Sequence, residues 1–166
     1  MRVERLTPRH FDRAREAVRT LKTAGRTGSP RPSLHRLRAY LSNRSNFLIV
    51  ASENGDPVGF AVAYCLLRVD GRRMMCLYEV AVAPPWQRRG VGIAMVDFLV
   101  GWCRRNRVSK MWVITNRSNV AAIRLYTAAG AIASGRTDDV LFEWHWRVPP
   151  GRTGAAARGS ASPPKR

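Results

Sequence analysis

The residues best suited to chemistry in this chain form a turn with two glycines, Gln-Arg-Arg-Gly-Val-Gly, at residues 87–92. An apolar run, 77–82, precedes this turn, and apolar side chains at helical spacing follow it. A helix that begins at such a turn presents free N–H groups and the positive end of its dipole, a combination that binds phosphate or pyrophosphate. Its glycines let an anion approach the backbone, and its two arginines add positive charge. The alternative is a plain tight turn with two surface arginines.

A second candidate is Glu79, an ionisable residue inside the apolar run 76–82. An unpaired carboxylate is costly to bury, so this one must be exposed in a cleft or paired. Strand alternation predicts that Leu77 and Ala81 share the face of Glu79. In a cleft, Glu79 would bind an ammonium and take its proton, directly or through water. At a sheet edge it would instead pair with one of the many arginines.

The segment at 119–126, Asn-Val-Ala-Ala-Ile-Arg-Leu-Tyr, is followed by Ala-Gly-Ala at 129–131. Together with the turn at 87–92 after a Val-Ala-Val strand, it resembles the motifs of the GNAT superfamily of acetyl-CoA-dependent N-acetyltransferases. The resemblance covers about residues 47–146. It implies an α/β (α+β) fold with a mixed, mostly antiparallel central sheet, whose strands splay apart in the middle, flanked by helices.

The resemblance also implies a reaction, the transfer of an acetyl group from acetyl-CoA as co-substrate to an acceptor amine. Tyr126 matches the family tyrosine that protonates the departing thiolate, although without the motif it would be interpreted as a core aromatic. Glu79 is the candidate general base that meets the amine. The residues expected to bind the cofactor, mainly through their backbone, are Val80, Ala81, Val82, Arg88, Arg89, Gly90, Val91, Gly92, Ile93 and the helix-capping Asn119.

Within the superfamily, residues 77–82 and 139–144 look most like the aminoglycoside 3-N-acetyltransferase group, which implies an aminoglycoside acceptor and antibiotic resistance. Asp138 and Asp139 would then bind substrate together with Glu79. The enzymes that acetylate ribosomal-protein N-termini carry a catalytic glutamate where this chain has Ile114, which argues against that subgroup. Because the net charge of +18 repels a polycation, a small amine, a polypeptide amine, and a non-catalytic protein that binds acyl-CoA or nucleic acid remain open alternatives.

The charge is uneven along the chain. Residues 1–46 carry 12 basic and 3 acidic side chains, a net +9, which is half of the total of +18. Such a basic surface favours non-specific contact with nucleic acid. Formation of a homodimer is left open as well.

No apolar run approaches the length of a membrane helix, and no apolar signal segment follows Met1, which predicts a cytoplasmic protein with no membrane contact. The three cysteines, Cys65, Cys76 and Cys103, are expected to be buried free thiols. No metal site is expected.

Periodicity and turn signals predict the elements that position these residues. Helices are expected from Thr7-Pro8 to Gly25, from Ser33 with Leu34, Leu37 and Leu41 inward, from the turn to about Asn106, and from Asn119. Strands are expected at Phe47–Ala51, Val58–Leu67, Met74–Val82, Met111–Thr115 and Val140–Trp146. The predicted order is two helices, three antiparallel strands, helix, strand, helix, strand. We expect one acetyltransferase domain at 1–148 and a disordered basic tail rich in Pro, Gly, Ala and Ser at 149–166.

Overall fold

The computed structural model describes residues 1–22 and 33–133, and the compact unit discussed below is Met1–Ala133. Five of the predictions lie outside the described residues: the end of the first helix at Gly25, Asp138, Asp139, the strand at 140–146 and the tail at 149–166.

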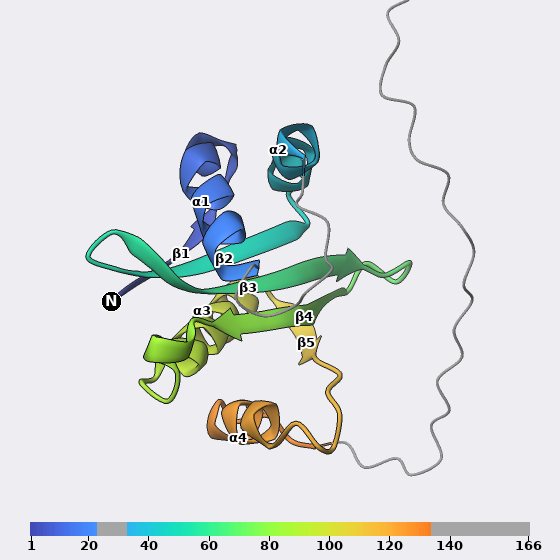
Figure 1. Ribbon diagram of the computed structural model, residues 1–166. Helices are drawn as coiled ribbons and strands as arrows, with labels where there is room; N and C mark the ends of the chain where they lie inside the picture. Colours follow the sequence, from blue (N-terminus) through green and yellow to red (C-terminus); the bar gives the residue numbers. More distant parts are fainter. Residues whose placement is uncertain (23–32, 134–166) are drawn as a thin grey trace, which may run out of the picture. The chain divides into compact units, whose positions relative to one another are not determined.

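A five-stranded sheet in the order β1-β2-β3-β4-β5 forms the centre of this unit (Figure 1). Its first four strands pair antiparallel, and β5 runs parallel to β4. The sheet is therefore mixed and mostly antiparallel, as predicted. Its strands are β1 (Arg2–Leu6), β2 (Asn46–Glu53), β3 (Asp56–Leu67), β4 (Arg73–Val82) and β5 (Val108–Trp112).

Helices cover both faces of the sheet. Figure 1 shows α1 (Phe11–Lys22) and α2 (Leu34–Ser42) on one side, and α3 (Val91–Arg105) on the other. The core is accordingly divided in two. The face under α1 and α2 buries Leu6, Ala14, Ala17, Val18, Leu37, Leu41, Leu48, Val50 and Phe60. The face under α3 buries Phe47, Ile49, Ala51, Val58, Ala61, Ala63, Met75, Leu77, Val91, Met95, Val96, Leu99 and Cys103.

The N-terminal strand β1 was not predicted from the sequence. It pairs only with β2, and its residues alternate between charged and apolar too irregularly to show a period of two. Glu4 is held by Arg13 of α1 at 2.6 Å, so an ion pair replaces apolar packing there. An edge strand of this kind is specified by its neighbour rather than by its own hydrophobic pattern.

The local signals at helix and hairpin ends are confirmed. Ser33 caps α2 by accepting a hydrogen bond from the Arg36 N–H at 3.2 Å. The turn between β2 and β3 uses Asn54 and Gly55, both with positive φ (50° and 96°), which is the conformation that this pair favours. After Thr7, however, a 3-10 turn (Pro8–His10) precedes α1.

Three predictions about side-chain position or boundaries are wrong. Leu34 is 55% exposed rather than inward, because it stands in the first turn of α2, while Leu37 and Leu41 are buried. The strand β5 begins at Val108, where it pairs with Arg73, and ends at Trp112, so it both begins and ends three residues before the predicted bounds. Of the cysteines, Cys103 alone is buried, whereas Cys65 and Cys76 are only half-buried.

Among the described residues no helix is both long and apolar enough to cross a membrane. Within the same ranges, no three His, Cys, Asp or Glu side chains come together as metal ligands would.

Candidate functional site

A β-bulge at Tyr78 decides which residues of β4 face which layer. On β3, Ala63 pairs with Leu77 and the preceding Val62 pairs with Glu79, so Tyr78 is an extra residue without a partner on β3. A bulge of this kind interrupts the alternation of side chains along a strand. The prediction that Leu77 shares the face of Glu79 is therefore wrong.

Beyond the bulge, β4 presents different residues to its two sides. Val80 and Val82 pack against the core under α3, as Leu77 does before the bulge. Ala81 packs against the core under α1 and α2, and Glu79, two residues earlier in the regular part of the strand, lies on the same face. Pairing with β5 ends at Cys76 and Trp112, so β4 from Leu77 onward has no strand beside it on that side within the described residues. This divergence is the predicted splay, and it leaves β4 between Leu77 and Ala81 without a strand partner on that side among the described residues.

The turn after β4 folds over the N-terminus of α3. Two of its residues adopt positive φ, Arg88 at 57° and Gly90 at 82°. Ala94 makes the first intrahelical bond, from its N–H to the Gly90 carbonyl at 3.0 Å. The N–H groups of Val91, Gly92 and Ile93 therefore precede the hydrogen-bonded part of the helix. Left-handed residues next to free N–H groups have the geometry of an anion-binding nest, which is the geometry that the pyrophosphate prediction requires.

Side chains fix this turn to its surroundings. The Gln87 amide donates to the Val82 carbonyl at 3.1 Å, which ties the turn to the end of β4. The guanidinium of Arg89 lies over the Trp86 ring, 5.4 Å from its centroid. Arg88 and Arg89 are both exposed, so both cations are available to an incoming polyanion.

Gly92 is a glycine for a reason that the sequence did not indicate. A Cβ atom at this position would lie 3.3 Å from both Leu125 methyl carbons and 3.8 Å from the nearer Val82 methyl carbon. The missing side chain therefore faces α4 (Val120–Ala128) rather than an anion. A side chain at this position would crowd Leu125, whereas the Gly92 N–H can still serve the nest.

The helix α4 positions the candidate proton donor. Asn119 caps it by accepting a hydrogen bond from the Ala122 N–H at 3.1 Å, as predicted. Tyr126 is half-buried against the core under α3, to which Val80 and Val82 also belong. Burial raises the pKa of Tyr126 above its usual value near 10, so its hydroxyl keeps its proton at neutral pH.

Three tyrosines form a row on this part of the sheet, and the middle one, Tyr64, lies close enough to Glu79 to interact with its charge. The ring of Tyr64 on β3 meets the rings of Tyr78 and of Tyr40 on α2 edge to face, with centroids 5.7 and 6.1 Å apart. Burial raises the pKa of Tyr64, a hydrogen bond with Tyr40 opposes this shift, and the negative charges of nearby groups, Glu79 among them, raise it further. Tyr78 is 69% exposed, so the row opens to solvent beside the carboxylate.

The sequence did not single out these tyrosines as site residues. Their only signal was an aromatic residue next to Glu79, and their convergence depends on the bulge and on pairing between distant strands. Position 114 holds an isoleucine, 75% exposed, and therefore offers no ionisable side chain.

The arrangement combines an anion nest, a free strand edge and a protonated tyrosine on one side of β4 with a carboxylate and aromatic rings on the other. A nest and a strand edge can hold a phosphorylated amide-containing cofactor. A carboxylate beside aromatic rings can hold an ammonium ion. The same pair of sites can bring a general acid and a general base to one reaction.

Comparison with known proteins agrees with this geometry. A model of the acetyltransferase (GNAT) family matches residues 14–131. Among curated proteins, the ribosomal protein bS18-alanine N-acetyltransferase of Escherichia coli is 32% identical over 79 residues, which are 48% of this chain and 50% of that enzyme. An uncharacterized N-acetyltransferase of Methanocaldococcus jannaschii is 28% identical over 85 residues, 49% of this chain and 37% of that protein. The match thus spans at most half the length of these relatives.

Solved structures show the same fold. An aminoglycoside acetyltransferase from an uncultured soil metagenomic sample, in complex with sisomicin, superposes with a TM-score of 0.76 at 17% identity over 89% of this chain and 95% of that one. A second soil aminoglycoside acetyltransferase has a TM-score of 0.70 at 25% identity, over 89% and 97%. The ribosomal-protein-alanine N-acetyltransferase of Brucella melitensis has a TM-score of 0.66 at 20% identity, over 88% and 100%.

Proposed function

The chain belongs to the acetyltransferase (GNAT) family, whose enzymes use acetyl-CoA as co-substrate, and we propose that it transfers an acetyl group to a primary amine. The bulge at Tyr78 is the observation that carries this proposal. It directs Glu79 to one face of β4 and leaves Val80 and Val82 on the face of Tyr126, so that the base and the acid approach the strand from opposite sides.

Each residue has a defined task in this proposal. The N–H groups of Val91, Gly92 and Ile93 bind the pyrophosphate, and the free edge of β4 orients the rest of the cofactor and polarises the acetyl carbonyl. Asn119, besides capping α4, is a further hydrogen-bond partner for the cofactor arm. The cofactor itself supplies an activated thioester. No step requires a charge to be buried without a partner.

The proton balance of the transfer involves two residues of this chain. Glu79 takes a proton from the acceptor ammonium, directly or through water, and passes it to solvent, so that the neutral amine can attack. The second proton, which the nitrogen loses as the amide forms and the C–S bond breaks, leaves by the same route. Tyr126 gives its proton to the departing thiolate and regains one from solvent. Because burial raises its pKa, Tyr126 is protonated at the start of every turnover at neutral pH.

The acceptor is a cation before it reacts, and the surroundings of Glu79 suit one. A carboxylate and the faces of Tyr64 and Tyr78 attract an ammonium by charge and by cation–π interaction. We propose an aminoglycoside amine as the first acceptor class, on the sequence resemblance and on the soil enzyme at 25% identity. The second acceptor class is the α-amine of a peptide that begins with alanine, because the curated relatives at 32% identity act on ribosomal protein bS18.

An acceptor screen tests this function. Thiol release from acetyl-CoA would be followed with aminoglycosides, peptides beginning with alanine, and polyamines, each against a matched N-acetylated control. Turnover with a free amine and none with its acetylated form is the expected result. Acetyl-CoA binding without turnover on any amine would contradict the enzymatic function and favour a non-catalytic acyl-CoA-binding protein.

A further inference from the structure

One end of the sheet is unusually basic, and neither the fold nor the proposed reaction uses it. We call it the basic end. It is formed by the β3–β4 hairpin, the C-terminus of α3 and the start of β5, and Asp70 is the single carboxylate of these segments. Seven cations are exposed there: Arg68, Arg72, Arg73, Arg104, Arg105, Arg107 and Lys110.

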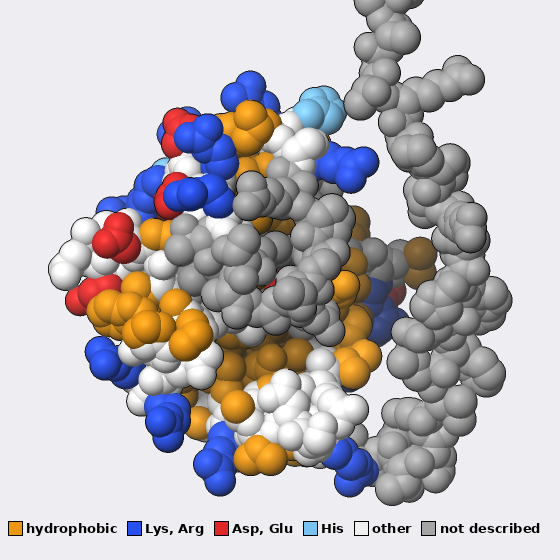
Figure 2. Space-filling model, in the orientation of Figure 1, with side chains coloured by type: hydrophobic (Ala, Val, Ile, Leu, Met, Phe, Trp, Pro, Cys, Tyr) orange, Lys and Arg blue, Asp and Glu red, His pale blue; other side chains and the backbone are white. Residues whose placement is uncertain are grey.

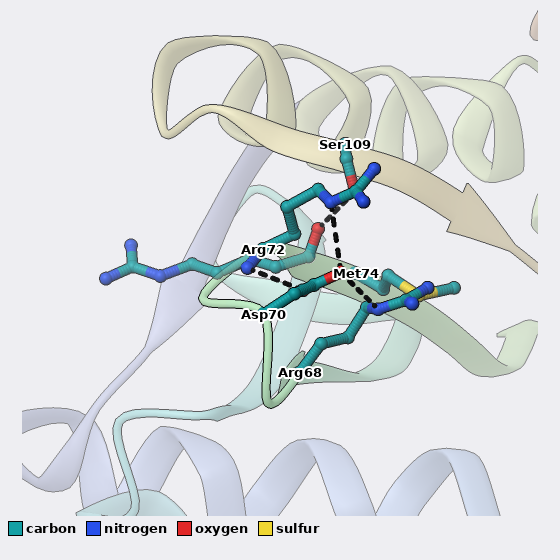
Figure 3. Close-up of polar contacts among 6 residues, drawn as sticks. Arg68, Asp70, Arg72, Met74 and Ser109 are labelled. Carbon is teal, nitrogen blue, oxygen red and sulfur yellow. Dashed lines mark hydrogen bonds and ion pairs between the residues drawn. The ribbon is translucent and has the colours of Figure 1, made fainter.

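Strand pairing brings these three segments together. Arg73 pairs with Val108 and Met74 with Lys110, so the first residues of β5 lie beside the hairpin. The Ser109 hydroxyl donates to the Arg73 carbonyl at 2.8 Å and fixes this junction (Figure 3). Only two residues, 106 and 107, separate α3 from β5, which keeps the helix end at the same edge.

Most of the cations at the basic end have no counter-charge. The Asp70 carboxylate pairs with Arg68 at 3.3 Å and with Arg72 at 3.1 Å, and Figure 3 shows it between these two side chains. No carboxylate among residues 1–22 and 33–133 pairs with the other five. The guanidinium of Arg105 folds back to within 3.2 Å of where a Cβ on Gly101 would be. Its own helix therefore supports it, rather than an acidic partner.

The N-terminal segment makes a useful contrast. It holds half of the net charge, and its three carboxylates pair with four of its arginines. Glu4 pairs with Arg2 and Arg13 at 3.2 and 2.6 Å, and Asp12 with Arg15 at 3.8 Å. Figure 2 shows red acidic atoms among the blue ones over α1. The cations of the basic end differ in that strand pairing gathers them at one edge of the sheet, where Asp70 is the carboxylate that pairs with them among the described residues.

We propose that the basic end binds the phosphate backbone of a nucleic acid. Guanidinium groups match phosphate oxygens in a bidentate geometry, and six of the seven cations are arginines. Exposed Leu67 and Val69 beside the hairpin tip offer apolar contacts for unstacked bases. With so many cations against two exposed apolar side chains, binding is mainly electrostatic, which suits a phosphate chain better than insertion into a lipid layer.

Titration of the full-length protein with a labelled single-stranded RNA and with a DNA duplex tests this proposal. The test variant carries Arg73→Gln, Arg104→Gln, Arg107→Gln and Lys110→Gln. The control removes the same charge elsewhere, with Arg2→Gln, Arg9→Gln, Arg15→Gln and Arg36→Gln. Both keep the C-terminal cations, and circular dichroism would verify that both are folded.

We expect the test variant to lose about tenfold or more in affinity at 100 mM salt. The slope of its log affinity against log salt concentration should become less negative by about 3 for single strands. The control should keep most of the wild-type affinity and most of its salt dependence. Comparison of the two nucleic acids identifies the preferred form. Equal losses in the two variants, no binding by the wild type, or preferential binding to phosphatidylserine vesicles would overturn the proposal. Because these residues lie outside the proposed acetyl-transfer site, acetyl-CoA turnover should be unaltered in both variants.

Discussion

Leu77 and Glu79, two positions apart on β4, lie on opposite faces of the sheet because Tyr78 between them is an unpaired bulge residue. Regular alternation would have sent Glu79 into the apolar core under α3. The bulge instead places it on the face of Tyr64 and Ala81, where a carboxylate can meet a polar ligand. A one-residue irregularity thus determines whether β4 can carry both halves of the proposed chemistry.

The anion nest can be tested at Gly90. The change Gly90→Asp places a carboxylate at the N-cap of α3, where it competes with a phosphate for the free N–H groups and repels it. We expect acetyl-CoA affinity to fall about tenfold or more, measured by calorimetry. The matched control is Gly71→Asp, which has nearly the same φ (78° against 82°) and equally open surroundings on a distant hairpin. Equal affinity for the two variants would contradict the nest.

The role assigned to Gly92 concerns packing and is tested separately. In Gly92→Ala the new Cβ would crowd the Leu125 methyl groups at 3.3 Å. We expect the free energy of unfolding to fall by about 1 kcal/mol in denaturant titration. The cost should be smaller in a Leu125→Val background, which shortens the opposing side chain. An identical cost in both backgrounds would show that the two residues are not coupled.

The proposed proton donor is tested by Tyr126→Phe, which keeps the ring packed against the core and removes only the hydroxyl. If chemistry limits the rate, kcat should fall by about 100-fold while acetyl-CoA affinity stays the same. The raised pKa of Tyr126 also predicts that the wild-type rate shows no loss from tyrosine ionisation below pH 10. An unchanged kcat in the variant would assign thiolate protonation to water or to another group.

Stability at high pH should reveal the buried tyrosines. Burial raises the pKa of Tyr40, Tyr64 and Tyr126 in the folded protein, so unfolding releases protons once the pH exceeds about 10, the value of an exposed tyrosine. The contribution of these three tyrosines to the free energy of unfolding is therefore constant below that pH and declines above it. Tyr40→Phe should make the decline shallower, but should cost about 1 kcal/mol at neutral pH by removing the hydrogen bond to the Phe47 carbonyl. Parallel slopes for wild type and variant would contradict this assignment.

The sequence was most informative where local chemistry alone determines structure. The caps at Ser33 and Asn119 and the turn at Asn54-Gly55 follow from the hydrogen-bonding and backbone preferences of those residues. The two motifs of the site were recognisable for the same reason, since each depends on a short spacing.

Features that depend on distant partners could not be predicted in this way. The strand β1 forms because β2 offers it an edge, and the side of Glu79 depends on a bulge that appears only when β4 pairs with β3. The purpose of Gly92 is visible only once Leu125 is placed beside it. The basic end likewise joins segments that are far apart in sequence, whereas a count along the chain pointed to the N-terminus.

The most direct test of the central claim is the rate of acetyl transfer by Glu79→Gln on the best acceptor found in the screen, beside Asp56→Asn, which removes the same charge from the exposed first residue of β3. Glu79→Gln keeps the shape of the side chain but can neither attract nor deprotonate an ammonium. We predict that its kcat/KM for the amine falls by about 100-fold or more, with acetyl-CoA affinity intact, while Asp56→Asn matches the wild type. Full activity of Glu79→Gln would contradict the assignment of Glu79 as the base and, with it, the proposal that the face opened by the bulge at Tyr78 receives the amine.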